Sequence, residues 1–169
     1  DPHGSTPLGY AKGSAAVGSS ATTNFGADGA ASTGSVVYTL QAASADVDSG
    51  LTTTEGVKIY LYTSGNLVVG RLGSGAGGAT ADANGTIAFA VAIDGSGTLN
   101  TVQYLSLNHP LGGSSNPNDP VSVAAGAIQV KVTVTDGDGD TASTTVNLGA
   151  NTVTFLDDAP SAGLALTSS

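Results

Sequence analysis

Residues 127–148 read AIQVKVTVTDGDGDTASTTVNL, two alternating stretches on either side of an acidic, glycine-rich turn. In the first stretch every second side chain is apolar: Ile128, Val130, Val132 and Val134. Side chains of a β-strand point alternately to opposite faces, so this stretch predicts a strand with one buried face. The stretch TASTTVNL (141–148) follows the turn directly. The whole segment is therefore predicted to be a β-hairpin that packs one face on a core.

Short stretches of similar character recur along the chain and predict further strands. They are SVVYTLQA (35–42), VKIYLY (57–62), LVVGRL (67–72), TIAFAVAI (86–93), TLNTVQYLSL (98–107) and NTVTFL (151–156). The turn TSGN, in which Gly65 suits a positive φ, and the turn DGSG (94–97) each predict a hairpin. Seven or eight strands and no helix predict an all-β fold, an antiparallel β-sandwich that is immunoglobulin-like or related.

Length and charge restrict the organisation of the chain and its partners. The 169 residues are enough for one domain with flanking segments. We expect a linker or flexible leader over residues 1–23, the sandwich domain over 24–160, and the start of a linker to a next module over 161–169. The net charge of −9 disfavours nucleic acid and anionic membrane surfaces as partners. No apolar run approaches the roughly 18 residues of a membrane span, so we expect no membrane insertion.

The absence of cysteine leaves two sources of stability, the core and a bound ion that prefers oxygen ligands. Two glycine-rich stretches, residues 73–85 and 109–120, are expected to be surface loops. Alternatively, they carry a binding surface or mark the insertion of another module.

The turn of the quoted hairpin places Asp136, Asp138 and Asp140 one residue apart. Their mutual repulsion is relieved by full solvation or by a bound cation. Glycines between them let the side chains converge, and Ca²⁺ accepts six to eight oxygens at about 2.3–2.6 Å from flexible loops. The segment does not match an EF-hand loop, since Thr141 stands where that loop needs glycine and Asn147 where it needs glutamate. Calcium binding and a merely solvated turn both remain open from the residues alone.

A second acidic pair, Asp157 and Asp158, follows the last predicted strand. It is either a solvated strand end or part of a cation site at a domain boundary. The segment Phe25 to Asp28 resembles Phe155 to Asp158 in spacing, at a separation of about one domain. If this similarity marks a repeat, the chain is one unit of a tandem array, in which Asp28 would bind an ion at the preceding junction; in so biased a composition the match also arises by chance.

Several blocks, in this order, carry a resemblance to a known family: FGADGAAS, SVVYTL, DSGLTTTEG, LVVGRLG, AFAVAID, VQYLSLNHP, DPVSV, VTVTDGDGDTAS and FLDDAPSA. Over about residues 24–162 the chain resembles the domain repeated in giant repeats-in-toxin (RTX) adhesins of Gram-negative bacteria. Ala30 stands where proline usually follows the entry Asp-Gly, and Ala159 stands where glycine is common.

The resemblance implies a calcium-binding β-sandwich module, secreted by the type I route to the bacterial cell surface. It implies a structural or extender role in a large adhesin that supports attachment and biofilm formation, with neighbouring domains of the same chain as partners. The acidic turn of the family corresponds to Asp136, Asp138 and Asp140 here. Its domain-entry acid corresponds to Asp28, and its domain-exit acids correspond to Asp157 and Asp158.

Two other classes of function compete with this expectation. An enzyme is disfavoured, because the only histidines are His3 in the expected leader and His109 beside a proline, and no nucleophile motif is present. The alternative function is a ligand-binding module for a host or surface carbohydrate or peptide. Its candidate platform is Tyr60 and Tyr62, which share the polar face of one predicted strand.

Overall fold

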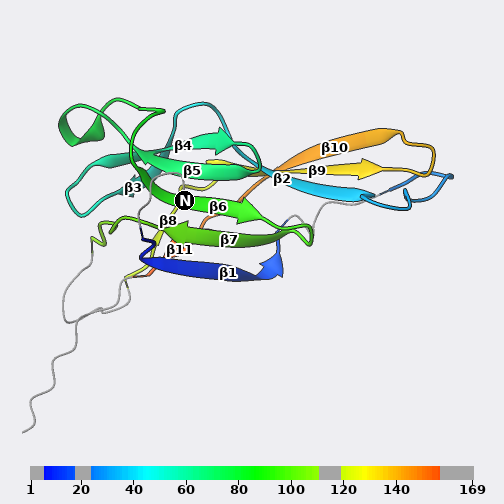
Figure 1. The fold of residues 1–169 in the computed structure, drawn as a ribbon, viewed down its shortest axis with the longest axis horizontal. Coiled ribbons are helices and arrows are strands. Elements are labelled where there is room, and N and C mark those ends of the chain that lie inside the picture. The colour runs from blue at the N-terminus through cyan, green and yellow to red at the C-terminus, as the bar shows by residue number, and fades with distance from the viewer. Residues whose placement is uncertain (1–5, 18–23, 111–118, 157–169) are drawn as a thin grey trace, which may run out of the picture.

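The computed structural model describes residues 6–17, 24–110 and 119–156 of the chain. Asp157 and Asp158 therefore lie outside the described residues. The fold is an all-β sandwich built from antiparallel strands, as the sequence predicts (Figure 1). The described part contains no helix that is long and apolar enough to cross a membrane.

One wide sheet and one narrow sheet make up most of the domain. The wide sheet has the strand order β1 (Gly9–Ala16), β7 (Thr98–Gln103), β6 (Ile87–Ile93), β5 (Leu67–Leu72), β4 (Lys58–Ser64) and β3 (Val47–Thr52). The narrow sheet has the order β10 (Thr141–Asn147), β9 (Ile128–Thr135) and β2 (Val36–Ala42). A third, two-stranded sheet pairs β11 (Thr154–Phe155) with β8 (Val121–Ser122). A single turn of 3₁₀-helix, η1 (Ala76–Gly78), lies between β5 and β6.

The core lies between the sheets and consists of the alternate apolar residues of their facing strands. Leu40 of β2 and Val130 of β9 come from the narrow sheet, whereas Ile59 of β4 and Phe89 of β6 come from the wide one, and all four are almost completely buried. Phe155 of β11 closes the core at one side, with its ring centroid 5.0 Å from that of Phe89. Burial of one face per strand fixes the register of both sheets.

The predicted hairpins form as expected. β9 and β10 pair from Thr135 with Thr141 to Gln129 with Asn147 without a register shift. β4 and β5 are joined by a turn in which Gly65 has a φ of 61°. β6 and β7 are joined through residues 94–97, and the Asp94 carboxylate accepts hydrogen bonds from the backbone N–H groups of Ser96 and Thr98 at 2.9 Å.

The outer face of the narrow sheet carries a row of amide side chains across its three strands. The Gln41 amide of β2 donates to the Gln129 side-chain carbonyl of β9 at 2.9 Å. The Gln129 amide in turn donates to the Asn147 side-chain carbonyl of β10 at 2.9 Å. This amide row supplements the backbone ladder with side-chain hydrogen bonds between neighbouring strands.

Three strands were not predicted from the sequence, and one of them changes the expected domain boundary. Residues 9–16 form β1, which pairs with β7 at the edge of the wide sheet, so the prediction that residues 1–23 are a linker or leader is wrong for this stretch. This strand could not be recognised from its sequence, GYAKGSAA, because its small residues show almost no alternation of apolar and polar side chains. β3 and the two-residue β8 were also missed. The sandwich therefore begins before residue 24.

The glycine-rich loop over residues 73–85 folds back onto β4 instead of standing free in solvent. The Tyr60 hydroxyl donates to the Ala79 carbonyl at 3.3 Å, and only 9% of Tyr60 is exposed. A Cβ atom on Gly78 would lie 2.8 Å from the backbone nitrogen of Lys58, so the close approach of loop and strand requires glycine. The loop thus covers part of the outer face of the wide sheet.

We predict that Gly70→Ala destabilises the domain by about 1–3 kcal/mol, because a Cβ atom there would lie 2.5 Å from the buried Phe89 ring. Gly95→Ala is the control, since a Cβ atom at that turn position meets no atom within 4 Å; it is expected to change stability by less than about 0.5 kcal/mol. Denaturant unfolding of both variants measures the difference. Equal stabilities would show that the core has room for a methyl group at position 70.

Candidate metal site at the tip of the narrow sheet

The turn between β9 and β10 is held by the side chain of its first residue. The Asp136 carboxylate accepts hydrogen bonds from the backbone N–H groups of Gly139 at 3.2 Å and Asp140 at 2.8 Å. The backbone N–H of Asp136 donates to the Asp140 carbonyl at 3.0 Å, which continues the ladder by one step. Gly139 has a φ of 99°, a conformation that L side chains rarely adopt. Asp136 therefore has a structural role in the turn besides its charge.

A second segment, the connection between β1 and β2, lies against this turn. The Gly137 N–H donates to the Gly29 carbonyl at 2.9 Å, and Ala30 forms an isolated bridge with Asp136. The Ala31 N–H donates to the Thr135 carbonyl at 3.1 Å. A Cβ atom on Gly137 would lie 2.5 Å from the Asp28 carbonyl oxygen, so the contact requires glycine at this position. Backbone hydrogen bonds thus position Asp28 beside the turn.

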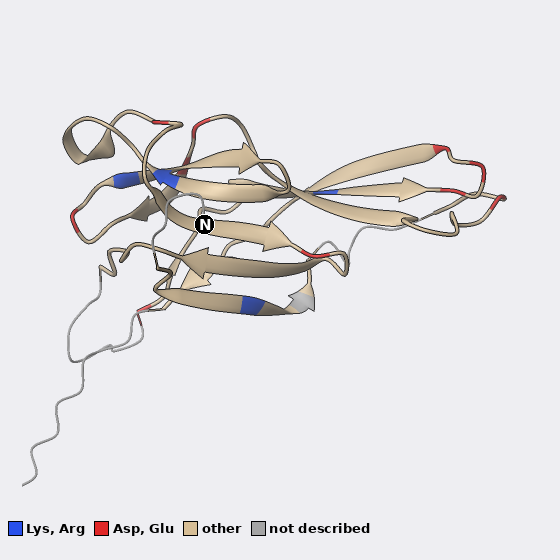
Figure 2. Ribbon diagram, viewed as in Figure 1, with Lys and Arg blue, Asp and Glu red and all other residues tan. Residues whose placement is uncertain are grey.

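The result is a cluster of three carboxylates, which we call the acidic cluster: Asp28, Asp136 and Asp138. One carboxylate oxygen from each lies within 4.8 Å of the other two. Asp136 is partly buried, whereas Asp28 and Asp138 are exposed. Figure 2 shows acidic residues gathered at the far end of the narrow sheet, away from the wide sheet. Three like charges at this separation repel one another, and a cation among them removes the repulsion.

The pKa of Asp136 is lowered from its ordinary value. The hydrogen bond with the Asp138 side chain contributes most, and backbone N–H groups of the turn add to the effect, whereas partial desolvation opposes it. Because the folded-state pKa is depressed, this carboxylate stabilises the fold near neutral pH, and the contribution is lost as the pH falls through the acidic range. The Asp136 carboxylate is therefore ionised and available as a ligand at neutral pH.

The donor set of the acidic cluster fits a hard divalent cation. Among the described residues, the side-chain atoms that converge there are three carboxylate oxygens, and Ca²⁺ prefers oxygen donors and accepts flexible and irregular geometry. Asp140 is exposed and is not one of the three converging carboxylates. It lines a small hollow of about 120 Å³ beside the cluster, together with Asn24, Phe25 and Asp136.

The structure changes the grouping that the sequence predicts. The sequence places Asp28 at a junction with a preceding domain, but it lies with Asp136 and Asp138 at the turn. β1 precedes Asp28 in the chain and belongs to the same domain, which makes Asp28 an internal residue of the fold. The signal for this contact lay in the glycines at positions 29 and 137, which permit the close approach. Asp157 and Asp158 are outside the described residues.

The structure does not present Tyr60 and Tyr62 as the exposed pair that the alternative function requires. Tyr60 is buried under the loop over residues 73–85, and burial, followed by the nearby Asp46 carboxylate, raises the pKa of Tyr62 to about 12. The two tyrosines are therefore not an exposed platform. His109 is partly buried, and its Nδ1 atom is in contact with the Asp119 backbone carbonyl.

Comparison with known proteins identifies a family. A family model described as "Domain of unknown function (DUF5801)" matches residues 4–149, well over half of the chain. The chain therefore belongs to this family. The match includes β1, in agreement with a domain that begins before residue 24. No curated protein and no solved structure was found to match the chain.

We predict that Gly137→Ala destabilises the metal-free domain by about 1–3 kcal/mol, because the new methyl group displaces the backbone at Asp28. Gly149→Ala is the matched control beyond the other end of β10, where the nearest atom to a new Cβ lies at 3.9 Å. Denaturant unfolding in excess chelator measures both. If the two variants lose the same free energy, the connecting segment is not packed against the turn.

Proposed function

We propose that the chain is a calcium-stabilised structural module of a large secreted adhesin on the bacterial cell surface, where it supports attachment and biofilm formation. The observation that carries the calcium part is the acidic cluster, in which Asp28 joins Asp136 and Asp138 from a distant part of the sequence. The surface adhesin, its type I secretion and its neighbouring domains as partners are supported by the resemblance of the sequence blocks to RTX adhesin repeats.

The geometry supports a specific way in which an ion stabilises the module. Asp28 belongs to the connection between β1 and β2, whereas Asp136 and Asp138 belong to the turn between β9 and β10. A bound ion would tie these two segments together and offset the repulsion among the three carboxylates. Both segments adjoin strands of the narrow sheet, so the ion would reinforce the far end of that sheet.

The expected gain in stability follows from mass action. Extracellular calcium modules bind at roughly 10⁻⁴–10⁻³ M. Free calcium about tenfold above the dissociation constant stabilises the folded state by about 1.4 kcal/mol per site. At the low free calcium of a bacterial cytoplasm the site would stay empty, so the module would be less stable before secretion than after it.

We predict that saturating Ca²⁺ raises the melting temperature by roughly 3–6 °C over excess chelator, the shift that about 1.4 kcal/mol produces in a chain of this size. Mg²⁺ is expected to give a smaller shift, because it requires near-ideal octahedral geometry. Differential scanning calorimetry in the three conditions measures both effects. An unchanged melting temperature in Ca²⁺ would exclude the proposed role of the ion.

Two substitutions locate the effect. Asp28→Asn is predicted to remove most of the calcium-dependent shift, yet to keep or raise the melting temperature in chelator, because it relieves repulsion. Asp136→Asn is also predicted to remove most of the shift, but to lower the melting temperature in chelator slightly, because the ionised Asp136 carboxylate stabilises the turn near neutral pH. Asparagine at position 136 keeps a side-chain oxygen that can accept the turn hydrogen bonds. Glu55→Gln removes an exposed charge elsewhere and should leave the shift intact. A full shift in Asp28→Asn would show that calcium binds at another place.

The alternative function, a ligand-binding module for a carbohydrate or peptide, receives no support from Tyr60 and Tyr62. One of the two rings is buried under a loop and the other has a shielded hydroxyl group. We therefore favour the structural, non-enzymatic role for the acidic cluster.

A further inference from the structure

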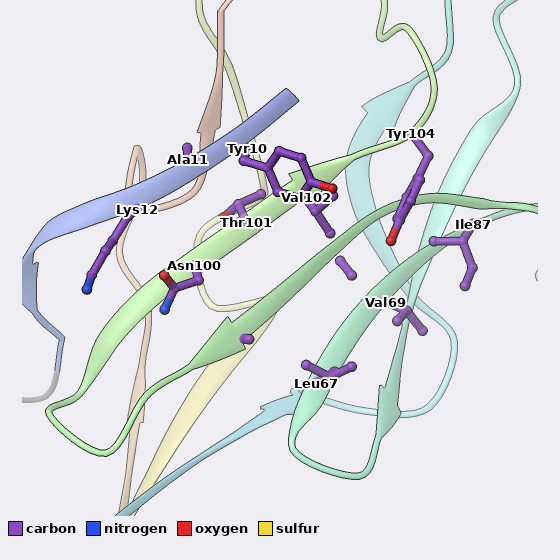
Figure 3. Close-up of a pocket in the computed structure, with 12 residues that line it drawn as sticks. Tyr10, Ala11, Lys12, Leu67, Val69, Ile87, Asn100, Thr101, Val102 and Tyr104 are labelled. Atoms are coloured by element: carbon purple, nitrogen blue, oxygen red, sulfur yellow. The ribbon is translucent and has the colours of Figure 1, made fainter. Parts of the chain in front are cut away.

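A groove crosses the outer face of the wide sheet, on the side away from the core (Figure 3). Its volume is about 640 Å³, within the roughly 300–1,000 Å³ range of small-molecule sites. It lies over β1, β5, β6 and β7, beside the part of the sheet that the loop over residues 73–85 covers. None of the residues that line the groove belongs to the acidic cluster or to the turn between β9 and β10, so we expect that binding in the groove does not require calcium.

The strand register explains why this face is hollow. One row across the four strands consists of Val69, Ala90, Val102 and Tyr10, and the next row consists of Leu67, Ala92, Asn100 and Lys12. In both rows the position on β6 is alanine, with larger side chains on either side. Two short side chains at the centre therefore form the floor, and the flanking side chains form the walls.

The groove is apolar along most of its length but polar at one corner. Figure 3 shows the Tyr10 and Tyr104 rings near one another toward one end, whereas Lys12 and Asn100 lie together toward the other. Lys12 is the one charged residue among those that line the groove. A positive group in this place is notable in a chain with a net charge of −9 and four basic residues.

The Lys12 ammonium forms only a weak ion pair within the protein. It lies 4.0 Å from the Asp94 carboxylate, and the lysine side chain is 69% exposed. Asp94 is already held by Ser96 and Thr98, whose hydrogen bonds lower the pKa of its carboxyl group. An exposed pair at this distance contributes little energy, so Lys12 can turn toward a ligand without a large cost.

The apolar part of the groove is exposed to an unusual degree for large side chains. Tyr10 is 78% exposed and Leu67 is 40% exposed, and they stand on opposite walls. Large apolar groups that surround a hollow are typical of binding sites on soluble proteins. Tyrosine adds an aromatic face and a hydroxyl group without much conformational entropy to lose.

We propose that this groove binds a small amphipathic organic anion, whose aromatic or aliphatic body lies on Ala90 and Ala92 between Tyr10 and Leu67. The anionic group of the ligand would contact the Lys12 ammonium, with the Asn100 amide as a second donor. Charge complementarity decides the ligand class, because a neutral apolar body alone would leave the polar corner unused.

A matched pair of fluorescent probes tests this proposal on the full chain. The anion 8-anilinonaphthalene-1-sulfonate and the neutral N-phenyl-1-naphthylamine share the aromatic body and differ in the sulfonate. We expect saturable binding of the anion to the folded protein, at least threefold tighter than binding of the neutral probe. Fluorescence titration gives both dissociation constants, and circular dichroism verifies that the protein remains folded.

Variants assign the binding to the groove. Lys12→Gln should weaken binding of the anionic probe at least threefold and leave binding of the neutral probe unchanged. Lys131→Gln, on the other sheet, should change the binding of neither probe. Ala90→Leu fills the floor and should weaken both probes about tenfold, with Thr145→Leu as a control that adds an exposed leucine on β10. Tyr10→Ala removes an exposed wall and serves as a second test should Ala90→Leu fail to fold.

Three outcomes would overturn the proposal. The first is an absence of saturable binding by the folded chain. The second is binding that is unaffected by both Ala90→Leu and Tyr10→Ala, which would place the probe elsewhere. The third is equal affinity for the two probes with no effect of Lys12→Gln, which would make the groove a purely apolar surface, such as a contact with another protein.

Discussion

Alternation of buried and exposed side chains is the constraint on which the rest of this structure depends. In β9, Ile128, Val130 and Val132 enter the core, and the residues between them face outward. A slip of one residue would exchange the two faces, so the register with β2 and β10 is fixed by burial. The position of the acidic turn follows from this register, because the turn begins where the paired part of β9 ends. The same constraint in the wide sheet aligns two alanines of β6 and forms the groove.

The parts of the fold that could be predicted from sequence are those in which alternation and turn chemistry agree. β5 and the hairpins that join β4 to β5, β6 to β7 and β9 to β10 meet this condition. β1 does not, because its glycine, alanine and serine residues show no pattern, and only pairing with β7 makes it a strand. β8 is too short to show a period. These two strands therefore form through pairing with strands far away in the chain, which local sequence patterns do not reveal.

The candidate site, like the fold, has residues that the sequence could identify and residues that it could not. Asp136 and Asp138 could be identified from their spacing in the turn, although the same spacing also included Asp140, which does not converge with them. The approach of Asp28 depends on backbone contacts between segments far apart in the chain. For the tyrosines, the alternation of the sequence predicts the wrong exposure. Tyr60 has the alternation of an exposed residue, but a loop covers it, whereas Tyr10, in a stretch without pattern, is the exposed one. Exposure in this protein depends on which loop folds over which strand.

The amide row of Gln41, Gln129 and Asn147 has a consequence for the environments in which the domain can work. Its hydrogen bonds join neutral groups, whose strength does not depend on ionic screening. The ion pairs of Lys12 with Asp94 and of Lys58 with Asp48 are both on the surface, and such pairs contribute little. Sodium chloride therefore has few favourable attractions to weaken among the described residues, and we expect added salt to cost this part of the fold little stability.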